Sequence, residues 1–165
     1  MNLTVIIPAR NEEDNVKITI DEVLSVVESI DEIDRTEVIV VDDHSMDNTY
    51  HVVKNIDDPR VSCLRLSRRG GSHTAFRAGL KEATGDVSVW ISADGQDDPS
   101  CLKEMILKWK RGANIVWALR KDREDESWYY RNASKFFYFL LNLLGGDRGN
   151  RVDQSRADFF LLDRA

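Results

Sequence analysis

Residues 3–13 (LTVIIPARNEE) decide the fold, because a short apolar run there ends abruptly in polar residues. Leu3 to Ile7 is apolar except for one threonine, which is typical of a strand buried on both faces. Apolar residues then recur at helical spacing from Val16 to Ile30 and predict an amphipathic helix. We expect Asn11 to cap that helix and the acids of residues 12–14 to favour the positive end of its dipole.

The same alternation continues along the chain and predicts an α/β fold. Strands are predicted over residues 3–7, 37–41, 61–66, 87–91, 114–119 and 157–162, and helices over 16–30, 47–55, 70–83, 99–109 and 128–144. Asp98 is expected to cap the fourth helix, with Pro99 at its first position. Strands that alternate with helices indicate a mostly parallel sheet with helices on both faces. We expect a single domain over residues 1–165, truncated at the C-terminus because no helix follows the last strand.

Composition excludes several classes of protein. The chain has 165 residues, of which 42% are hydrophobic and 32% charged, so it is globular and not disordered. Its net charge of −6 argues against a nucleic-acid partner. Cys63 and Cys101 form no spacing motif and suit a reduced compartment. No signal peptide and no apolar stretch of ~20 residues is present, so a cytoplasmic location is predicted.

One segment departs from this acidic balance. Residues 108–135 hold eight Lys or Arg and four acids, and they precede the apolar run of residues 136–144. Such a segment predicts a contact with phosphates or with a membrane surface, and a solvated loop beside a core helix is the alternative. We expect the helix of residues 128–144 to approach an acceptor or the membrane interface.

Polar clusters follow four of the predicted strands: Pro8 to Asn11, Asp42 with Asp43, Arg68 with Arg69, and Asp94 to Asp97. Ligands of parallel sheets bind beyond the carboxyl ends of the strands, so these clusters predict one site. Neither a Gly-x-Gly-x-x-Gly after the first strand nor a Walker A motif occurs. A bound nucleotide would therefore be held by side chains and a metal.

The acidic residues of these clusters each have two interpretations. Asp42 and Asp43 either bind a nucleotide base or cap the following turn. Asp94 and the oxygens near it either hold Mg²⁺ or Mn²⁺, or belong to an Asp-rich turn. Asp158, in an otherwise apolar strand, is either a site carboxylate or the partner of an arginine. The candidate arginines are Arg131, Arg151 and Arg156.

Taken together, residues 5–13, 40–49, 66–80 and 93–97 resemble family 2 glycosyltransferases. Within that family the chain is similar to the branch of dolichol-phosphate mannose synthase and bacterial polyprenyl-phosphate glycosyltransferases. Support for the branch comes from residues 120–124, Trp128, Arg131, Ser134 and Asp158 with Phe159. The resemblance covers essentially the whole chain.

The resemblance implies an A-type glycosyltransferase fold, which is Rossmann-like, and a nucleotide-sugar donor. Residues that would bind the nucleotide sugar are Pro8, Ala9, Arg10, Glu12, Asp43, Arg68 and Asp94. Asp94 matches the last acid of the family's Asp-x-Asp metal motif and Gln96 an additional ligand for Mg²⁺ or Mn²⁺. The first acid is missing, because Ser92 stands in its place.

The implied reaction is an inverting sugar transfer from a UDP- or GDP-sugar to a polyprenyl phosphate, as in cell-wall or polysaccharide biosynthesis. Asp94 and Asp158 would be catalytic, and Arg131 and Ser134 would position the acceptor. Two alternatives stay open: transfer to a saccharide hydroxyl, and a nucleotide-sugar-binding module with impaired catalysis. The branch suggests the cytoplasmic face of a membrane as the location, and the sequence leaves a homo-oligomer open.

Overall fold

The computed structural model describes residues 1–118 and 159–164. Its strands are β1 (Asn2–Ala9), β2 (Arg35–Asp42), β3 (Val61–Arg65), β4 (Val87–Trp90), β5 (Ile115–Ala118) and β6 (Phe159–Asp163). Its helices are α1 (Val16–Glu28), α2 (Thr49–Lys54), α3 (Ser72–Glu82), a short 3-10 turn η1 (Pro99–Cys101) and α4 (Leu102–Lys110).

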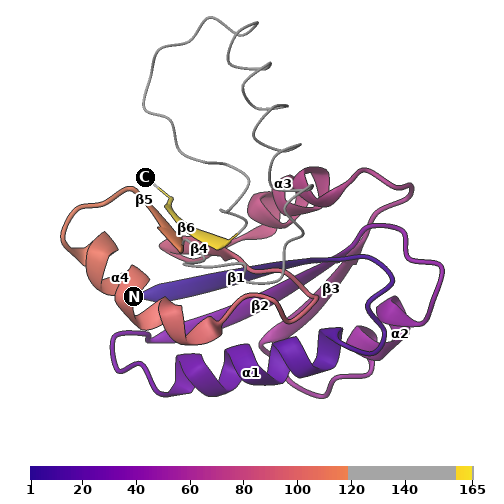
Figure 1. Cartoon of the computed structure of the whole chain (residues 1–165), viewed down its shortest axis with the longest axis horizontal. Coiled ribbons are helices and arrows are strands. Elements are labelled where there is room, and N and C mark those ends of the chain that lie inside the picture. The colour runs from indigo at the N-terminus through magenta and orange to yellow at the C-terminus, as the bar shows by residue number, and fades with distance from the viewer. Residues whose placement is uncertain (119–158, 165) are drawn as a thin grey trace, which may run out of the picture. The chain divides into compact units, whose positions relative to one another are not determined.

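The described strands form one sheet in the order β3-β2-β1-β4-β6-β5 (Figure 1). β1 pairs in parallel with both β2 and β4, and β2 pairs in parallel with β3. β6 instead runs antiparallel to β4 and β5. The predicted α/β class with a mostly parallel sheet is therefore confirmed, with the last strand as the antiparallel exception.

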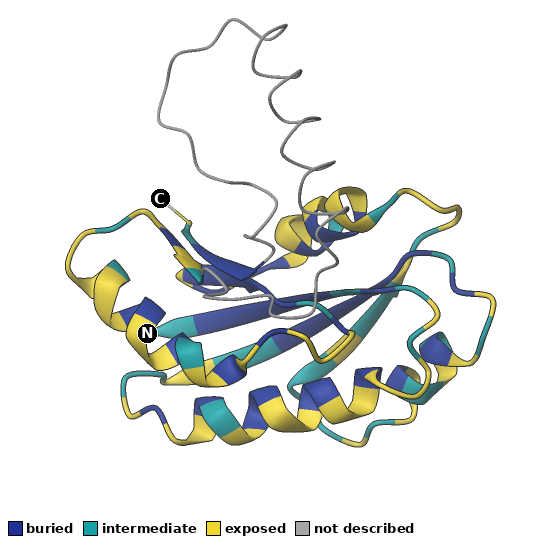
Figure 2. Cartoon of the chain, viewed as in Figure 1, coloured by how far each residue is buried: buried dark blue, intermediate teal, exposed yellow. Residues whose placement is uncertain are grey.

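Helices cover both faces of the sheet, as the alternating sequence pattern predicted. Side chains from α1, α2 and α4 pack against one face in the larger core cluster, which contains Val5 and Ile7 of β1. The other face packs against α3 through Ile6, Phe76 and Trp90. Figure 2 shows β1 buried between these layers. A strand covered on both faces must be apolar at successive positions, which explains residues 3–7.

A glycine brings α3 close to the sheet. A Cβ atom at Gly79 would lie 2.6 Å from Ile6 Cγ2 and 3.1 Å from Val41 Cγ2. Both distances are shorter than a van der Waals contact, so a larger residue would push the helix away from β1 and β2.

The capping residue of α1 differs from the prediction, although the helix begins at Val16 as predicted. Asn11 does not cap the helix, because its φ of 56° is left-handed and α1 starts only at Val16. The side chain of Asn11 instead accepts a hydrogen bond from the Met46 amide at 2.9 Å. The acids of residues 12–14 precede α1, and no acidic residue lies in its first turn. The loop of residues 11–15 is bonded to the chain after β2, and its Glu12 carbonyl also accepts from the Val16 amide of α1 at 2.8 Å.

The predicted cap at Asp98 is confirmed. Its Oδ1 accepts a hydrogen bond from the Ser100 amide at 2.9 Å, and Pro99 occupies the first position of η1, which leads into α4. The predicted helix of residues 128–144 lies outside the described residues. Within residues 1–118 and 159–164, no helix is long and apolar enough to cross a membrane.

Candidate functional site

The carboxyl ends of β1, β2 and β4 share one edge of the sheet, because these strands are parallel neighbours. Pro8 and Ala9 end β1 and residues 10–12 follow it, Asp43 follows β2, and Asp94 lies four residues beyond the end of β4. β3 ends at the same edge and leads toward Arg68. The structure thus brings the polar clusters of these strands to the edge where parallel sheets bind ligands.

The turn after β2 is built around a buried carboxylate. Asp42 is 0% exposed, and its Oδ1 accepts a hydrogen bond from the Ser45 amide at 3.0 Å. Its Oδ2 lies 3.1 Å from Nε of Arg65, the last residue of β3. A buried charge requires such a partner, because desolvation would otherwise disfavour the ionised form. Asp42 therefore caps the turn after β2, which is one of the two interpretations that the sequence allowed.

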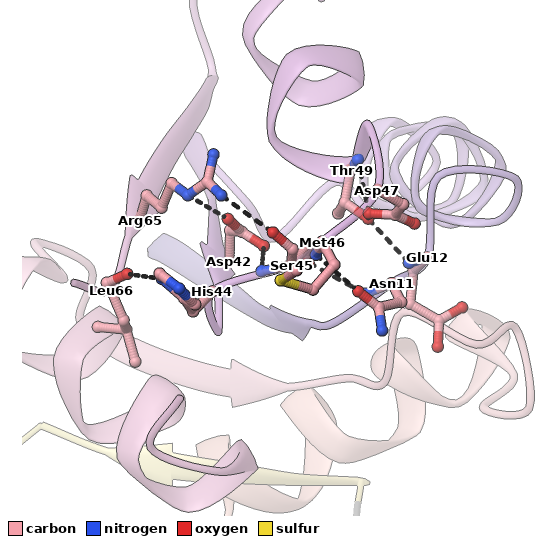
Figure 3. Close-up of polar contacts among 10 residues, drawn as sticks. All are labelled: Asn11, Glu12, Asp42, His44, Ser45, Met46, Asp47, Thr49, Arg65 and Leu66. Atoms are coloured by element: carbon pink, nitrogen blue, oxygen red, sulfur yellow. Dashed lines mark hydrogen bonds and ion pairs between the residues drawn. The ribbon is translucent and has the colours of Figure 1, made fainter. Parts of the chain in front are cut away.

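The turn after β2 also holds the loop that follows β1 (Figure 3). The Asn11 amide donates to Ser45 Oγ at 3.0 Å, and the Glu12 amide donates to Thr49 Oγ1 at 2.8 Å. The Asn11 side chain accepts from the Met46 amide, so the contact runs in both directions. Two loops from different strands thereby become one hydrogen-bonded unit, which we call the turn network (residues 11–12, 42–49 and Arg65).

Asp47 belongs to this network and has a perturbed acidity. Burial alone would raise the pKa of its carboxyl. Hydrogen bonds from the side chain and amide of Thr49 and from the Glu13 amide together lower the pKa by more, so the net shift is downward. The ionised form is the acceptor in each of these bonds. Asp47 therefore stabilises the start of α2 as a carboxylate.

Asp43 is 3% exposed and connects the turn to α3. Its Oδ1 accepts from the Gly70 amide at 2.6 Å and its Oδ2 from the Gly71 amide at 2.8 Å. Gly71 precedes α3 with a φ of 85°, a conformation that favours glycine. An ionised carboxylate has about four acceptor sites, so Asp43 retains capacity for a further donor.

The other residues predicted for the nucleotide sugar differ in exposure. Ala9 is buried, Pro8 and Glu12 are half-buried, and Arg68 is exposed. Glu12 accepts a hydrogen bond from the Asn15 side chain at 2.9 Å. The Arg10 Nε atom is buried and has no hydrogen-bond partner among the described residues. A buried donor without a partner is costly, which makes Arg10 a candidate for binding an anion.

The loop after β4 is more open than the turn network. Asp94 is exposed, and its Oδ1 accepts from the Gln96 amide at 3.0 Å across Gly95, whose φ is 70°. Asp97 is 8% exposed, and its Oδ2 accepts from the Ser92 amide at 2.9 Å. Asp97 thus bonds to the backbone of Ser92, the residue that stands in place of the first acid of the family's metal motif.

This loop fits a divalent cation that is held in part by its substrate. Among residues 1–118 and 159–164, no group of three His, Cys, Asp or Glu side chains gathers to hold a metal. Asp94 and Gln96 offer exposed oxygens, and Mg²⁺ is commonly held by one or two carboxylates together with substrate phosphates and water. The donor set therefore fits Mg²⁺ or Mn²⁺ only if phosphates complete the shell.

The sequence did not single out Arg65, Ser45 or Thr49. A signal for Arg65 exists in the register of the sheet, because Asp42 and Arg65 are direct partners across β2 and β3. That signal requires the strand pairing and cannot be read from spacing alone. Asp158, Arg131 and Ser134 lie outside the described residues, so their roles stay predictions.

Comparison with known proteins decides the family. The model of "Glycosyl transferase family 2" matches residues 4–162. The chain belongs to this family. The chain is 30% identical to the "Prophage bactoprenol glucosyl transferase homolog" of Escherichia coli over 99% of its own length and 53% of that protein. It is 29% identical to the "Undecaprenyl-phosphate 4-deoxy-4-formamido-L-arabinose transferase" of Proteus mirabilis over 87% of the chain and 44% of that protein.

A solved structure supports the A-type glycosyltransferase fold. The "Mannosyltransferase PcManGT from Pyrobaculum calidifontis in complex with GDP-Man and Mn2+" is 22% identical, with a TM-score of 0.63 over 98% of the chain and 44% of that protein. The predicted fold and the predicted resemblance to polyprenyl-phosphate glycosyltransferases are confirmed. The chain spans about half the length of the curated relatives it matches.

Proposed function

We propose that the protein transfers a sugar, with inversion, from a UDP- or GDP-sugar to a polyprenyl phosphate. The observation that carries this proposal is the arrangement of the sheet edge. A hydrogen-bonded turn network lies beside an exposed carboxylate, Asp94, at the ends of adjacent parallel strands. The names of the Escherichia coli and Proteus mirabilis relatives support a polyprenyl-phosphate acceptor.

The nucleotide would bind against the turn network. Asp43 would accept from the base, and Pro8, Ala9 and Glu12 would line the base and ribose. Arg10 and Arg68 would be the cationic partners, and the buried Nε of Arg10, which has no hydrogen-bond partner among the described residues, supports this role. Because the loops are already joined by hydrogen bonds, binding there orders little additional chain.

The diphosphate would lie over the loop after β4. Asp94 and Gln96 would hold Mg²⁺ or Mn²⁺, and the Mn²⁺ in the PcManGT complex supports a metal at such a site in this fold. When bound, the cation supplies a Lewis acid that stabilises negative charge on the departing diphosphate. Asp97 keeps this loop in place through the Ser92 amide.

The acceptor phosphate would attack the anomeric carbon of the sugar. A new bond forms from that carbon to the acceptor oxygen while the bond to the nucleoside diphosphate breaks. A phosphate is already anionic at neutral pH, so the step requires no general base. Arg131, Ser134 and Asp158 are proposed for the acceptor and lie outside the described residues.

Ser92 favours a second candidate, a nucleotide-sugar-binding module with impaired catalysis, because a metal-motif acid is absent there. Transfer to a saccharide hydroxyl is a further alternative, in which Asp158 would take the hydroxyl proton. The test incubates the full natural protein with radiolabelled UDP- or GDP-sugars, Mn²⁺, undecaprenyl phosphate and a saccharide acceptor. Label that enters the lipid extract supports the proposal. Label only in the saccharide, or nucleotide binding without transfer, supports one of the alternatives instead.

A further inference from the structure

Arg65 joins two groups of the turn network, Asp42 and Ser45, and also contacts the Tyr50 ring through the same guanidinium. Its Nε lies 3.1 Å from Asp42 Oδ2, and its Nη2 donates to the Ser45 carbonyl at 2.9 Å. The same guanidinium lies over the Tyr50 ring, 5.1 Å from the centroid. Planar Arg can make all of these contacts at once, whereas Lys offers a single point charge. Figure 3 shows Arg65 reaching from β3 toward Asp42 and Ser45.

The groups that Arg65 holds are the ones that position the loop after β1. Ser45 is 2% exposed, and its hydroxyl accepts from the Asn11 amide. The next residue, Met46, donates its amide to the Asn11 side chain. Asn11 has a left-handed φ of 56°, which asparagine adopts more readily than most residues, and these two bonds hold it in that conformation.

We propose that Arg65 is a positioning residue for nucleotide binding, acting through Asp42 and Ser45 on the loop of residues 8–12. This inference rests on the proposed function, because it assumes that the loop binds a nucleotide. Arg65 would raise affinity by keeping the loop in its bound geometry before the ligand arrives. Its loss would leave Asp42 buried and unpaired and would loosen the turn at Ser45.

The chain offers a matched control in Arg60. Arg60 also forms ion pairs, with Asp58 at 2.7 Å and Glu28 at 2.8 Å, and its side chain is 34% exposed against 38% for Arg65. Arg60 precedes β3, at the opposite end of that strand from Arg65. Substitution of Arg60 therefore removes the ion pairs of a similarly exposed arginine, whose partners are less buried than Asp42, without touching the turn network.

The experiment measures calorimetric binding of UDP and GDP, with Mn²⁺, to the parent protein and to Arg65→Gln, Arg65→Lys and Arg60→Gln. Amide hydrogen exchange of Asn11 and Glu12 is followed in the same proteins, well below their melting temperatures. We expect the dissociation constant to rise about tenfold in Arg65→Gln, less in Arg65→Lys, and not at all in Arg60→Gln. Exchange at Asn11 should accelerate only in the Arg65 variants.

Unchanged affinity in folded Arg65 variants overturns the inference. The inference is also overturned if nucleotide affinity falls in proportion to the melting temperature in Arg60→Gln as it does in the Arg65 variants. Arg65 would then contribute to stability alone. If Arg65→Gln does not fold, Arg65→Lys decides, since it keeps a positive charge beside Asp42. A parent protein that binds neither nucleotide contradicts the proposed function, and the role of Arg65 in binding falls with it.

Discussion

Two loops at the same edge of the sheet are built in opposite ways. After β2, Asp42, Asp43 and Ser45 are buried, and hydrogen bonds tie the turn to the loop after β1 and to α3. After β4, Asp94 is exposed. Among the described residues, its carboxylate accepts one hydrogen bond, from the nearby Gln96 amide. The first region has its geometry before any ligand binds, and the second exposes the carboxylate of Asp94 to a ligand.

This difference suggests a division of work. Groups that are satisfied by the protein can shape a surface for a base and ribose, because their positions are fixed. An exposed carboxylate costs little while solvated and binds a cation well when phosphates share the shell. Changes in the turn network should therefore affect stability and binding together, whereas changes at Asp94 should affect only function.

The largest effect is expected for Asp94→Asn. Sugar transfer should fall by a factor of ~100 or more, because the proposed metal would supply several kcal/mol of charge stabilisation. The melting temperature without ligand should not change, since Asp94 is exposed. Transfer assays with Mn²⁺ and with a chelator, together with thermal unfolding, provide the measurement.

Asp57→Asn is the control for this prediction, because Asp57 is also exposed and lies between α2 and β3, away from the site edge. That variant should match the parent in both assays. Turnover that persists in chelator, or an Asp94→Asn enzyme nearly as active as the parent, would show that the loop after β4 does not hold a catalytic metal.

Asp43→Ala tests the other side of the comparison. Nucleotide affinity should weaken by about 1–3 kcal/mol, the cost of leaving a buried donor unpaired. Unfolding free energy should fall as well, because the Gly70 and Gly71 amides both lose their acceptor. Calorimetry and urea unfolding measure the two effects. Weaker stability with unchanged affinity would limit Asp43 to its structural role.

Asp98→Ala should affect stability alone. The variant removes the bond from the Ser100 amide that begins η1, and loss of such a cap costs about 1 kcal/mol. Nucleotide affinity should stay at the parent value, although Asp98 lies only four residues from Asp94. A change in affinity measured by calorimetry would mean that the loop after β4 is coupled to its helix.

The smallest effect concerns pH. The pKa of Asp47 is lowered in the folded protein from an ordinary value of 3.8, so its contribution to stability is present above that value and is lost as pH falls through the lowered value. Asp47→Asn should reduce stability near neutral pH, and the gap to the parent should close below about pH 4. Urea unfolding across pH 3 to 7 measures it. A gap that stays constant with pH would exclude a contribution from ionised Asp47.

Much of the fold follows from local pattern. Short runs rich in β-branched residues located β1, β2 and β4, and the Asp98-Pro99 pair located η1. The cap of α1 was predicted wrongly, because Asn11 bonds to Ser45 and Met46, which are distant in sequence. Hydrogen bonds from a neighbouring loop overrode the local capping preference.

The site shows the same limit. Its residues at strand ends could be chosen from sequence, because parallel strands carry their ligands at one edge. The sequence could not show that Asp43 would hold two glycine amides, or that Arg65 would pair with Asp42. Both contacts depend on the register of β2 and β3 and on the position of α3, which no single segment encodes.

The central claim is that the turn network binds the nucleoside and the loop after β4 binds the metal with the diphosphate. Calorimetry of uridine, guanosine, UDP and GDP, each with Mn²⁺ and with a chelator, tests it most directly. We predict that one nucleoside binds equally in both conditions, and that its diphosphate binds more tightly only with Mn²⁺ and only when Asp94 is intact. A nucleoside that needs Mn²⁺ to bind, or a diphosphate whose added affinity survives both the chelator and Asp94→Asn, would contradict the account.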